Sequence, residues 1–289
     1  MKPNQTISLD VNQKQIDTLF ALYQDQQKPN NNPYVLAHFK TEECTIIIYK
    51  SHKVVFSGPM ASHHASIIQA TLPNKAHAGS DEVGTGDYFG PVCVCAVYIS
   101  DDQFSWLDQL SIKDSKQLTD DKILELAPKL QAKLVYSLLI LPNDKYNKQH
   151  QVDNMNALKA KLHNQAYLHL QKKVNHPFKA IIDQFTPKAQ YYKYLADQPE
   201  IFHQLTFETK AENKVLAVAC AAIIARYAFL KSMDQLSQQV GLTLPKGASE
   251  LVDQTGVMLV NKHGFKILDK VAKVHFKNTE KIKELLKQQ

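Results

Sequence analysis

The chain has 289 residues and a formal net charge of +6, from 34 lysine and arginine residues against 28 aspartate and glutamate residues. Its hydrophobic fraction of 44% and charged fraction of 21% are those of an ordinary globular protein of one or two domains. No segment is interpreted as a transmembrane span, and the N-terminus MKPNQTISLD lacks the apolar core of a secretory signal. These features favour a cytoplasmic protein, and the basic surplus is compatible with a polyanionic partner.

The first part of the chain, residues 1–72, is predicted to form a separate α+β unit. Apolar residues at helical spacing predict a helix within residues 8–26. Three short β-rich runs joined by polar turns follow, and then a helix with Pro59 near its start. The runs are residues 34–40, 44–50 and 53–58, and the helix is 58–72. Residues 73–79 (PNKAHAG) are predicted to be a linker.

The remaining residues, 80–289, alternate strands and helices. Strands are predicted at 92–99, 134–141, 178–185 and 203–212, and helices at 156–174 and 213–241. This alternation predicts an α/β layer domain, and the short connections between its early strands favour a mixed sheet. The four cysteines are expected to be buried free thiols, because none is spaced for zinc and two alternate with valine in a strand.

Two adjacent acids, Asp81 and Glu82, open the glycine-rich stretch DEVGTGDYFG. The glycine spacing and the strand that follows do not fit a dinucleotide-binding loop. Neighbouring side chains of a strand point to opposite faces, so both acids could serve one site only where the strand bends. A metal site and a hairpin with a charged end both remain open on these residues alone.

Two further acids, Asp183 and Glu212, lie at the ends of apolar segments and are candidate functional carboxylates. Asp183 ends the apolar strand AIIDQF, where a charge is costly unless it is paired or bound to metal. Glu212 lies at the entry to the long apolar helix, where the helix dipole alone could favour it. If these acids converge, oxygen ligands of this kind suit Mg²⁺, and two such ions can drive phosphodiester hydrolysis.

Five stretches in order resemble one known family. They are GSDEVGTGDYFGPV, KDSKQLTD, AIIDQF, TKAENKVLAVACAAIIARYAFL and HFKNT, and they span roughly residues 78–289. These stretches resemble ribonuclease HIII, a bacterial branch of the type 2 ribonucleases H. The resemblance implies a ribonuclease H-like mixed-sheet catalytic domain, and residues 1–72 resemble the branch's extra domain, which has a TATA-binding-protein-like fold and would bind substrate.

The resemblance implies a metal-dependent endoribonuclease that cleaves the RNA strand of RNA/DNA hybrids and leaves 5′-phosphate and 3′-hydroxyl ends. It carries four catalytic, metal-binding acids onto this chain, which would hold Mg²⁺ or Mn²⁺, with two ions expected. These acids are Asp81, Glu82, Asp183 and Glu212. No membrane partner and no obligate protein partner are expected, and a monomer is predicted.

Substrate contacts are also expected from the resemblance. The turn Gly84-Thr85-Gly86 could approach the minor groove, where 2′-hydroxyls distinguish RNA from DNA. Ser115 and Lys116 are candidate phosphate contacts, and Asn154 is a further candidate that could instead only cap a helix. In the N-terminal unit, Tyr49, Lys50 and Lys53 are expected to contact the hybrid.

Two alternatives stay open. Ribonuclease HII, the sibling enzyme, carries Gly-Arg-Gly at this turn and excises single embedded ribonucleotides, whereas Thr85 here lacks the guanidinium donors. A non-catalytic hybrid-binding protein is the other alternative. Clustered carboxylates argue against it, because they would repel phosphates unless metal intervened.

Overall fold

The computed structural model describes residues 4–11, 13–70, 76–110, 112 and 118–288. The chain divides into two compact units, residues 1–74 and 75–289. The expected linker, 73–79, is too long at its C-terminal end, because His77, Ala78 and Gly79 already belong to a strand that pairs with Ile99, Tyr98 and Val97. Among the described residues, only the helix Leu216–Val240 is long and apolar enough to cross a membrane, and it is packed in the core of the second unit.

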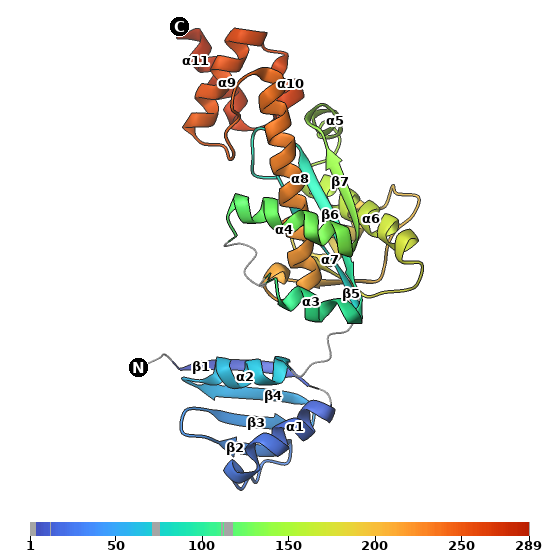
Figure 1. Ribbon diagram of the computed structural model, residues 1–289, viewed down its shortest axis with the longest axis vertical. Coiled ribbons are helices and arrows are strands. Elements are labelled where there is room, and N and C mark those ends of the chain that lie inside the picture. Colours follow the sequence, from blue (N-terminus) through green and yellow to red (C-terminus); the bar gives the residue numbers. More distant parts are fainter. Residues whose placement is uncertain (1–3, 12, 71–75, 111, 113–117, 289) are drawn as a thin grey trace. The chain divides into compact units, whose positions relative to one another are not determined.

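The N-terminal unit is a four-stranded antiparallel sheet in the order β1-β4-β3-β2 with two helices (Figure 1). Its buried cluster lies on one face of the sheet and joins both helices to alternate strand residues such as Ile46, Ile48 and Phe56. This arrangement is consistent with the expected TATA-binding-protein-like fold. The elements are β1 (Gln5–Asp10), α1 (Gln13–Tyr23), β2 (Val35–Lys40), β3 (Thr45–Tyr49), β4 (Lys53–Gly58) and α2 (Ala61–Ala70).

The first strand of this unit was not expected from the sequence. Residues 8–10 belong to the stretch predicted to be helical, but they lie in β1, which pairs with the whole of β4. Only Ile7 and Leu9 of β1 pack on the core, while its other residues are exposed. A period-2 pattern of two apolar residues is too short to stand out beside the helical pattern that follows it.

The second unit is built on a five-stranded mixed sheet in the order β7-β6-β5-β8-β9. The pairs β5–β6 and β6–β7 are antiparallel, and β5–β8 and β8–β9 are parallel, which confirms the expected mixed sheet. The strands are β5 (His77–Val83), β6 (Val92–Ile99), β7 (Val135–Leu141), β8 (Ala180–Asp183) and β9 (Leu205–Glu208).

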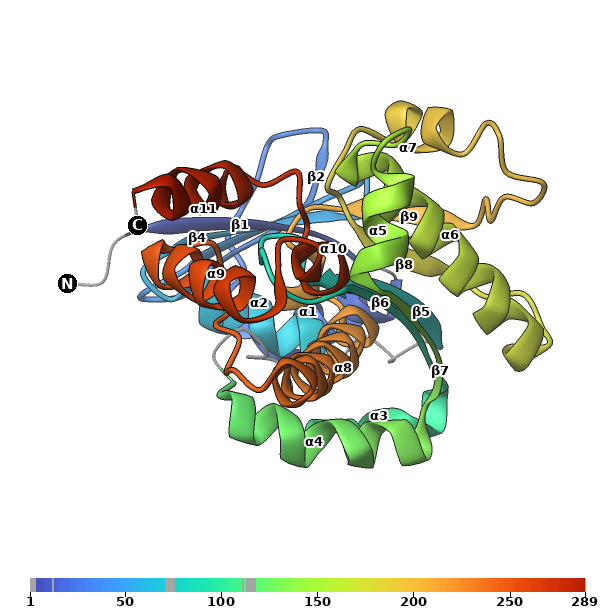
Figure 2. The ribbon, with the colours of Figure 1, turned by 90° about the horizontal axis from the view of Figure 1, so that it is seen from above.

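Helices cover both faces of this sheet (Figure 2). On one side α8 packs across β5 and β6, with α4 outside it; on the other side α6 packs on β6 and β7. The remaining C-terminal helices form a group beyond the end of α8 (Figure 1). The helices are α3 (Phe104–Asp108), α4 (Asp120–Lys133), α5 (Asn143–Gln149), α6 (Met155–Val174), α7 (Lys188–Tyr194), α8 (Leu216–Val240), α9 (Glu250–His263), α10 (Ile267–Val271) and α11 (Lys277–Lys287).

The central strand β6 separates two apolar cores. Its residues are all buried, and they alternate between a core under α8 and α4 and a core under α6. Cys93 and Cys95 face the first core, and Val94 faces the second. All four cysteines are buried free thiols, as expected. Helix α8 approaches closely because β5 carries Gly79, where an added Cβ would lie 2.5 Å from Val218 N.

Candidate active site

The two adjacent acids project from opposite faces of the sheet. Strand β5 pairs with β6 in an unbroken register in which Asp81 stands opposite Cys95 and Glu82 opposite Val94. Because paired residues of an antiparallel ladder share a face, Asp81 faces the α8 layer and Glu82 faces the α6 layer. The bend that would turn both carboxylates into one site is therefore absent from β5.

Asp81 shares its face with two acids from other elements. Asp183 ends β8, and the residue before it, Ile182, packs in the α6 core, so Asp183 points toward α8. Ala211 N donates to Asp183 Oδ1 (2.9 Å). Glu212 follows in the 3₁₀ turn η4 (Ala211–Asn213) that leads into α8, and it is 5% exposed. Strand, strand end and turn thus bring three carboxylates to one side of the sheet.

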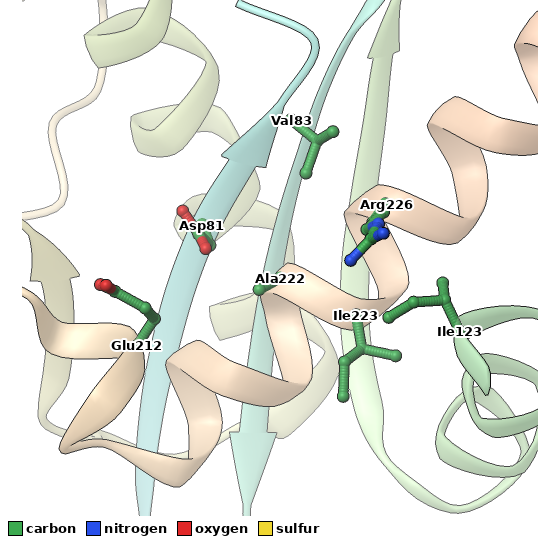
Figure 3. Close-up of a pocket in the computed structure, with 7 residues that line it drawn as sticks. All are labelled: Asp81, Val83, Ile123, Glu212, Ala222, Ile223 and Arg226. Atoms are coloured by element: carbon green, nitrogen blue, oxygen red, sulfur yellow. The ribbon is translucent and has the colours of Figure 1, made fainter. Parts of the chain in front are cut away.

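A pocket opens beside these acids (Figure 3). Asp81 and Glu212 lie on one side of it, and the first half of α8 contributes Arg226 at the other. Arg226 is the only arginine of the chain. It donates to Leu118 O (2.9 Å) and pairs with Asp120 (2.6 Å). The full lining is Asp81, Val83, Ile123, Glu212, Ala222, Ile223 and Arg226.

The charge environment of Asp81 disfavours its ionised form. Burial raises the pKa of Asp81 well above its usual range, and the negative charge of Glu82 raises it further. A hydrogen bond from Glu82 N to Asp81 Oδ1 (2.8 Å) opposes this, while Asp183 and Glu212 add to it. A bound cation would relieve the repulsion that these neighbouring carboxylates exert on Asp81.

Glu82 has the opposite environment, because two side chains of α6, Lys159 and His163, hold it. Lys159 Nζ pairs with Oε1, and His163 Nε2 lies 2.8 Å from Oε2. Burial alone would raise the pKa of Glu82, but His163 and Lys159 outweigh it and lower that pKa to about 2. His163 is in turn held by Ser80 Oγ (2.7 Å), and Lys159 Nζ lies 3.9 Å from the ring centroid of Phe185. Glu82 is thus a carboxylate held in place, with its ionised form favoured by its partners.

The donor set on the α8 face fits a hard divalent cation. Its three side chains offer only carboxylate oxygens, the ligands that Mg²⁺ and Mn²⁺ prefer. They come from three elements, and Asp183 and Glu212 add to the effect of burial and Glu82 in raising the pKa of Asp81. Within the described part of the chain, no three His, Cys, Asp or Glu side chains form a ready-made metal cage. The fit therefore rests on donor chemistry and on the repulsion at Asp81.

Comparison with known families decides what this site belongs to. The family model described as Ribonuclease HII matches residues 78–279. The chain belongs to the ribonuclease HII family. A second model, described as a domain of unknown function (DUF3378), matches residues 6–80.

The relatives place this ribonuclease H in the HIII branch. Ribonuclease HIII of Bacillus licheniformis is 42% identical over 85% of this chain and 87% of its own. Ribonuclease HIII of Streptococcus mutans is 39% identical over 98% and 99%. A crystal structure of Bst-RNase HIII in complex with Mn²⁺ is 33% identical, covers 99% of this chain and 100% of its own, and has a TM-score of 0.76. The expected family and the expected metal-dependent endoribonuclease activity on RNA/DNA hybrids are thereby confirmed.

The glycine turn of this ribonuclease H lies at the carboxyl end of β5. Gly84 has φ +96°, and an added Cβ there would lie 2.2 Å from Pro91 O, so only glycine fits. Asp87 N donates to Gly84 O (3.4 Å) and closes the turn around Thr85 and Gly86. Gly86 is exposed, and an added Cβ there would meet nothing within 4 Å. The tip of the turn is therefore open to a ligand.

The other residues expected to contact the substrate lie in three separate parts of the chain. Asn154 is exposed and caps α6, accepting a hydrogen bond from Ala157 N (2.9 Å). Ser115 and Lys116 lie outside the described residues. Tyr49 ends β3, and Lys50 and Lys53 are exposed where β3 turns into β4. Contact of these residues with substrate stays a prediction.

Lys159 was not singled out from the sequence. In the stretch NALKAKLHN it reads as one of several lysines of a solvated helix face, yet it is only 8% exposed. A signal was present, because Lys159 and His163 are four residues apart and therefore share a helix face. Without knowing that Glu82 faces this helix, nothing in the pattern connects the pair to the acids.

Proposed function

We propose that this ribonuclease H cuts the RNA strand within RNA/DNA hybrids at the α8 face of its sheet, leaving 5′-phosphate and 3′-hydroxyl ends. The observation that supports this site most is the gathering of Asp81, Asp183 and Glu212 on one face beside an open pocket. A protein that only bound polyanions would gain nothing from these acids, because they repel phosphates unless a cation intervenes.

Two Mg²⁺ or Mn²⁺ ions, when bound, would supply an activated water and neutralise charge on the departing 3′ oxygen. Asp81, Asp183 and Glu212, which lie on the same face of the sheet, would hold the ions with their carboxylate oxygens. The hydrogen bond from Ala211 fixes Asp183 Oδ1 and leaves its other oxygen for an ion. Glu82 stays the fourth candidate ligand by the family resemblance, although Lys159 and His163 hold its carboxylate on the α6 side of the sheet.

The turn at Gly84, Thr85 and Gly86 would meet the minor groove of the hybrid, where the 2′-hydroxyls lie. It stands at the end of the same strand that carries Asp81. Thr85 offers one hydroxyl in place of a guanidinium fork, which favours hybrids with several ribonucleotides over a single embedded one. Ser115, Lys116 and Asn154 remain candidate backbone contacts.

The N-terminal unit would bind the hybrid with the face of its sheet that its own helices leave open. Strand residues on that face include Ile47, Tyr49 and Lys53, which alternate with the buried Ile46, Ile48 and Val54. Lys50 lies at the adjoining turn, so two positive charges and an aromatic ring are available to a nucleic-acid backbone. We expect the protein to act in the cytoplasm as a monomer without an obligate protein partner.

One experiment separates this proposal from its alternatives. The full chain is given a labelled RNA/DNA hybrid and, separately, a DNA duplex with one ribonucleotide, each with Mg²⁺, with Mn²⁺ and with chelator. Cutting of the hybrid that stops in chelator supports the proposal, and efficient cutting at the single ribonucleotide supports the ribonuclease HII-like alternative. Binding without cutting under every condition would show a non-catalytic protein.

The residues are tested by substitution. Asp81→Asn, Asp183→Asn and Glu212→Gln should each reduce kcat by at least about 10³-fold, on the scale of losing a principal electrostatic group. Asp144→Asn, at an exposed position in the first turn of α5, is the matched control and should cut normally. Wild-type cleavage by Asp81→Asn would show that this site is wrongly placed even if the protein is a hybrid nuclease.

A further inference from the structure

The loop between β5 and β6, residues 84–91, is fastened by two segments from the far end of the chain. Tyr88 N donates to Gly247 O (2.8 Å), and Gly90 N donates to Val271 O (2.9 Å). In return, Lys273 N donates to Tyr88 O (2.8 Å). The shape of the loop is therefore set from outside the loop, by the segment after α8 and the segment after α10.

Lys273 also reaches the loop with its side chain. The residue is fully buried, and its Nζ donates to the carbonyl oxygens of Asp87 (2.8 Å) and Gly90 (2.5 Å). The same Nζ lies 5.9 Å from the ring centroid of Tyr146 on α5. One ammonium thus ties two points of the loop to each other and to the C-terminal segment.

Both of these points control the glycine turn. Asp87 closes the turn through its N–H to Gly84 O (3.4 Å), and its Oδ1 accepts from Gly247 N (2.6 Å). Gly90 has φ +84°, and its carbonyl accepts a second hydrogen bond from Asn143 Nδ2 (2.9 Å). Both carbonyls belong to the same short loop as Thr85 and Gly86, so we expect a shift of either carbonyl to displace the tip.

Packing alone does not call for a charge at this position. An unbranched apolar side chain of similar length would fill the same space without the cost of desolvating an ammonium. What lysine adds is two charge-assisted hydrogen bonds that fix the direction of two loop carbonyls. The buried ammonium of Lys273 is therefore better explained by its effect on the shape of the exposed Gly84–Gly86 turn than by packing in the core.

We propose that Lys273 is a positioning residue for substrate binding, which holds the β5–β6 loop so that the Gly84–Gly86 turn presents its backbone to the hybrid. This inference rests on the proposed role of that turn in meeting the minor groove. Lys273 itself touches no reacting atom. Its loss should therefore weaken hybrid binding and leave the chemical step at saturation nearly unchanged.

The ionisation of Lys273 offers a readout that simple packing lacks. Burial lowers the pKa of Lys273 to about 8, against the opposing effect of Asp87. Other titratable groups face it from β6, α5 and its own segment. Burial raises the pKa of Cys93 to about 12, raises that of Tyr146 and lowers that of His275 to about 4. These three groups do not change charge between pH 7 and 9, whereas Lys273 does.

The test measures KM and kcat for a labelled RNA/DNA hybrid from pH 6.5 to 9.5, with wild type, Lys273→Met and Leu170→Ala. Leu170 is fully buried on α6, so its substitution loosens the core without touching the loop. In wild type, KM should rise several-fold as pH passes 8. In Lys273→Met, KM should be about tenfold higher at pH 7 and lack that rise, with kcat within twofold of wild type. Anisotropy with the same hybrid in chelator should show the same loss of binding.

Three outcomes overturn the inference. They are a Lys273→Met variant with wild-type KM, a Leu170→Ala control with the same increase in KM, and a wild-type KM that is flat between pH 7 and 9. The last measurement needs no variant, so it decides the matter even if Lys273→Met does not fold. Failure of the wild type to cut the hybrid at all would instead contradict the proposed function.

Discussion

Asp81 and Glu82 are adjacent on β5, yet their carboxylates have opposite electrostatic environments. Burial, Glu82 and two further acids raise the pKa of Asp81, while His163 and Lys159 overcome burial and lower the pKa of Glu82 to about 2. The difference follows from strand geometry, which sends one side chain toward α8 and the other toward α6. Asp81 is thus placed to bind a cation, whereas the carboxylate of Glu82 is already held by Lys159 and His163.

The first prediction concerns the stability of the metal-free protein. A carboxyl whose pKa is raised by folding adds stability below its unfolded pKa and loses it as pH rises through the folded pKa. Asp81→Asn should therefore raise Tm in chelator at neutral pH, by about 2–4 °C if the relieved repulsion is about 1 kcal/mol. The gain should shrink toward pH 4, where Asp81 is protonated.

Thermal unfolding across pH checks this, with and without Mn²⁺. Adding Mn²⁺ should raise the Tm of the wild type more than that of Asp81→Asn, and so remove the difference in Tm between the two proteins. The exposed control, Asp144→Asn, should show no gain at any pH. An Asp81→Asn variant that is less stable than wild type in chelator at pH 7 would contradict the repulsion inferred at this site.

The second prediction concerns the ion pair behind the site. Lys159→Met leaves a buried carboxylate with one partner, which typically costs about 3–5 kcal/mol at pH 7. A lowered folded pKa adds stability above the unfolded value of 4.5, and that stability is lost as pH falls toward about 2. The difference in unfolding free energy between wild type and Lys159→Met should therefore narrow below pH 4.5.

Urea unfolding at pH 7, 4.5 and 3 measures that difference. Lys122→Met is the control, since Lys122 pairs with Glu125 on the exposed side of α4 and its loss should cost under about 1 kcal/mol. Equal losses for the two variants, or a difference that stays constant down to pH 3, would mean that the pair does not stabilise Glu82.

The third prediction uses two glycines of one turn as a matched pair. Gly84→Ala should destabilise the protein strongly, because φ is +96° and the new Cβ would meet Pro91 O at 2.2 Å. Gly86→Ala should fold normally, because its Cβ would point into open space. If the tip meets the minor groove, Gly86→Ala should nevertheless raise KM for the hybrid by about tenfold.

Circular dichroism melts and steady-state kinetics distinguish the two glycines. Normal folding with a raised KM for Gly86→Ala supports contact between the tip and the substrate. A Gly86→Ala variant with wild-type KM would exclude a close approach of that backbone to the hybrid, and normal stability of Gly84→Ala would contradict the geometry of the turn.

Much of the fold could be predicted because its signals are local. The apolar run of β6 and the alanine-rich stretch of α8 read directly from the sequence, and Gly241 ends α8 in the left-handed conformation, as its place after the helix indicates. The sequence does not predict β1, because its two apolar residues are too few to show the alternation typical of a strand. The small and polar residues His77–Gly79 predict a linker, but they pair with β6, because backbone pairing does not require apolar side chains.

The four acids could be proposed from the sequence through the family resemblance, but the face of the sheet that each one takes could not be predicted. Which face each carboxylate takes depends on the register of β5 with β6 and β8, and register is set by pairing between distant segments. For the same reason, the sequence does not predict that Glu82 pairs with Lys159 or that the loop carrying the glycine turn is bonded to Lys273. Both lysines lie far along the chain from their partners, in stretches where lysine is common.

The last prediction concerns the N-terminal unit. Lys50 and Lys53 are exposed beside Tyr49, and if they contact phosphates, each should contribute to affinity through counterion release. Lys50→Glu and Lys53→Glu should raise KM for the hybrid with kcat unchanged, and each should reduce the slope of log affinity against log salt by about 1.

Lys172→Glu, an exposed charge reversal in the last turn of α6, is the control. Measuring hybrid affinity by anisotropy between 50 and 300 mM salt, roughly the range over which such contacts are lost, tests this. If all three variants weaken binding equally, the loss reflects net charge, and the N-terminal sheet would have no special part in holding the substrate.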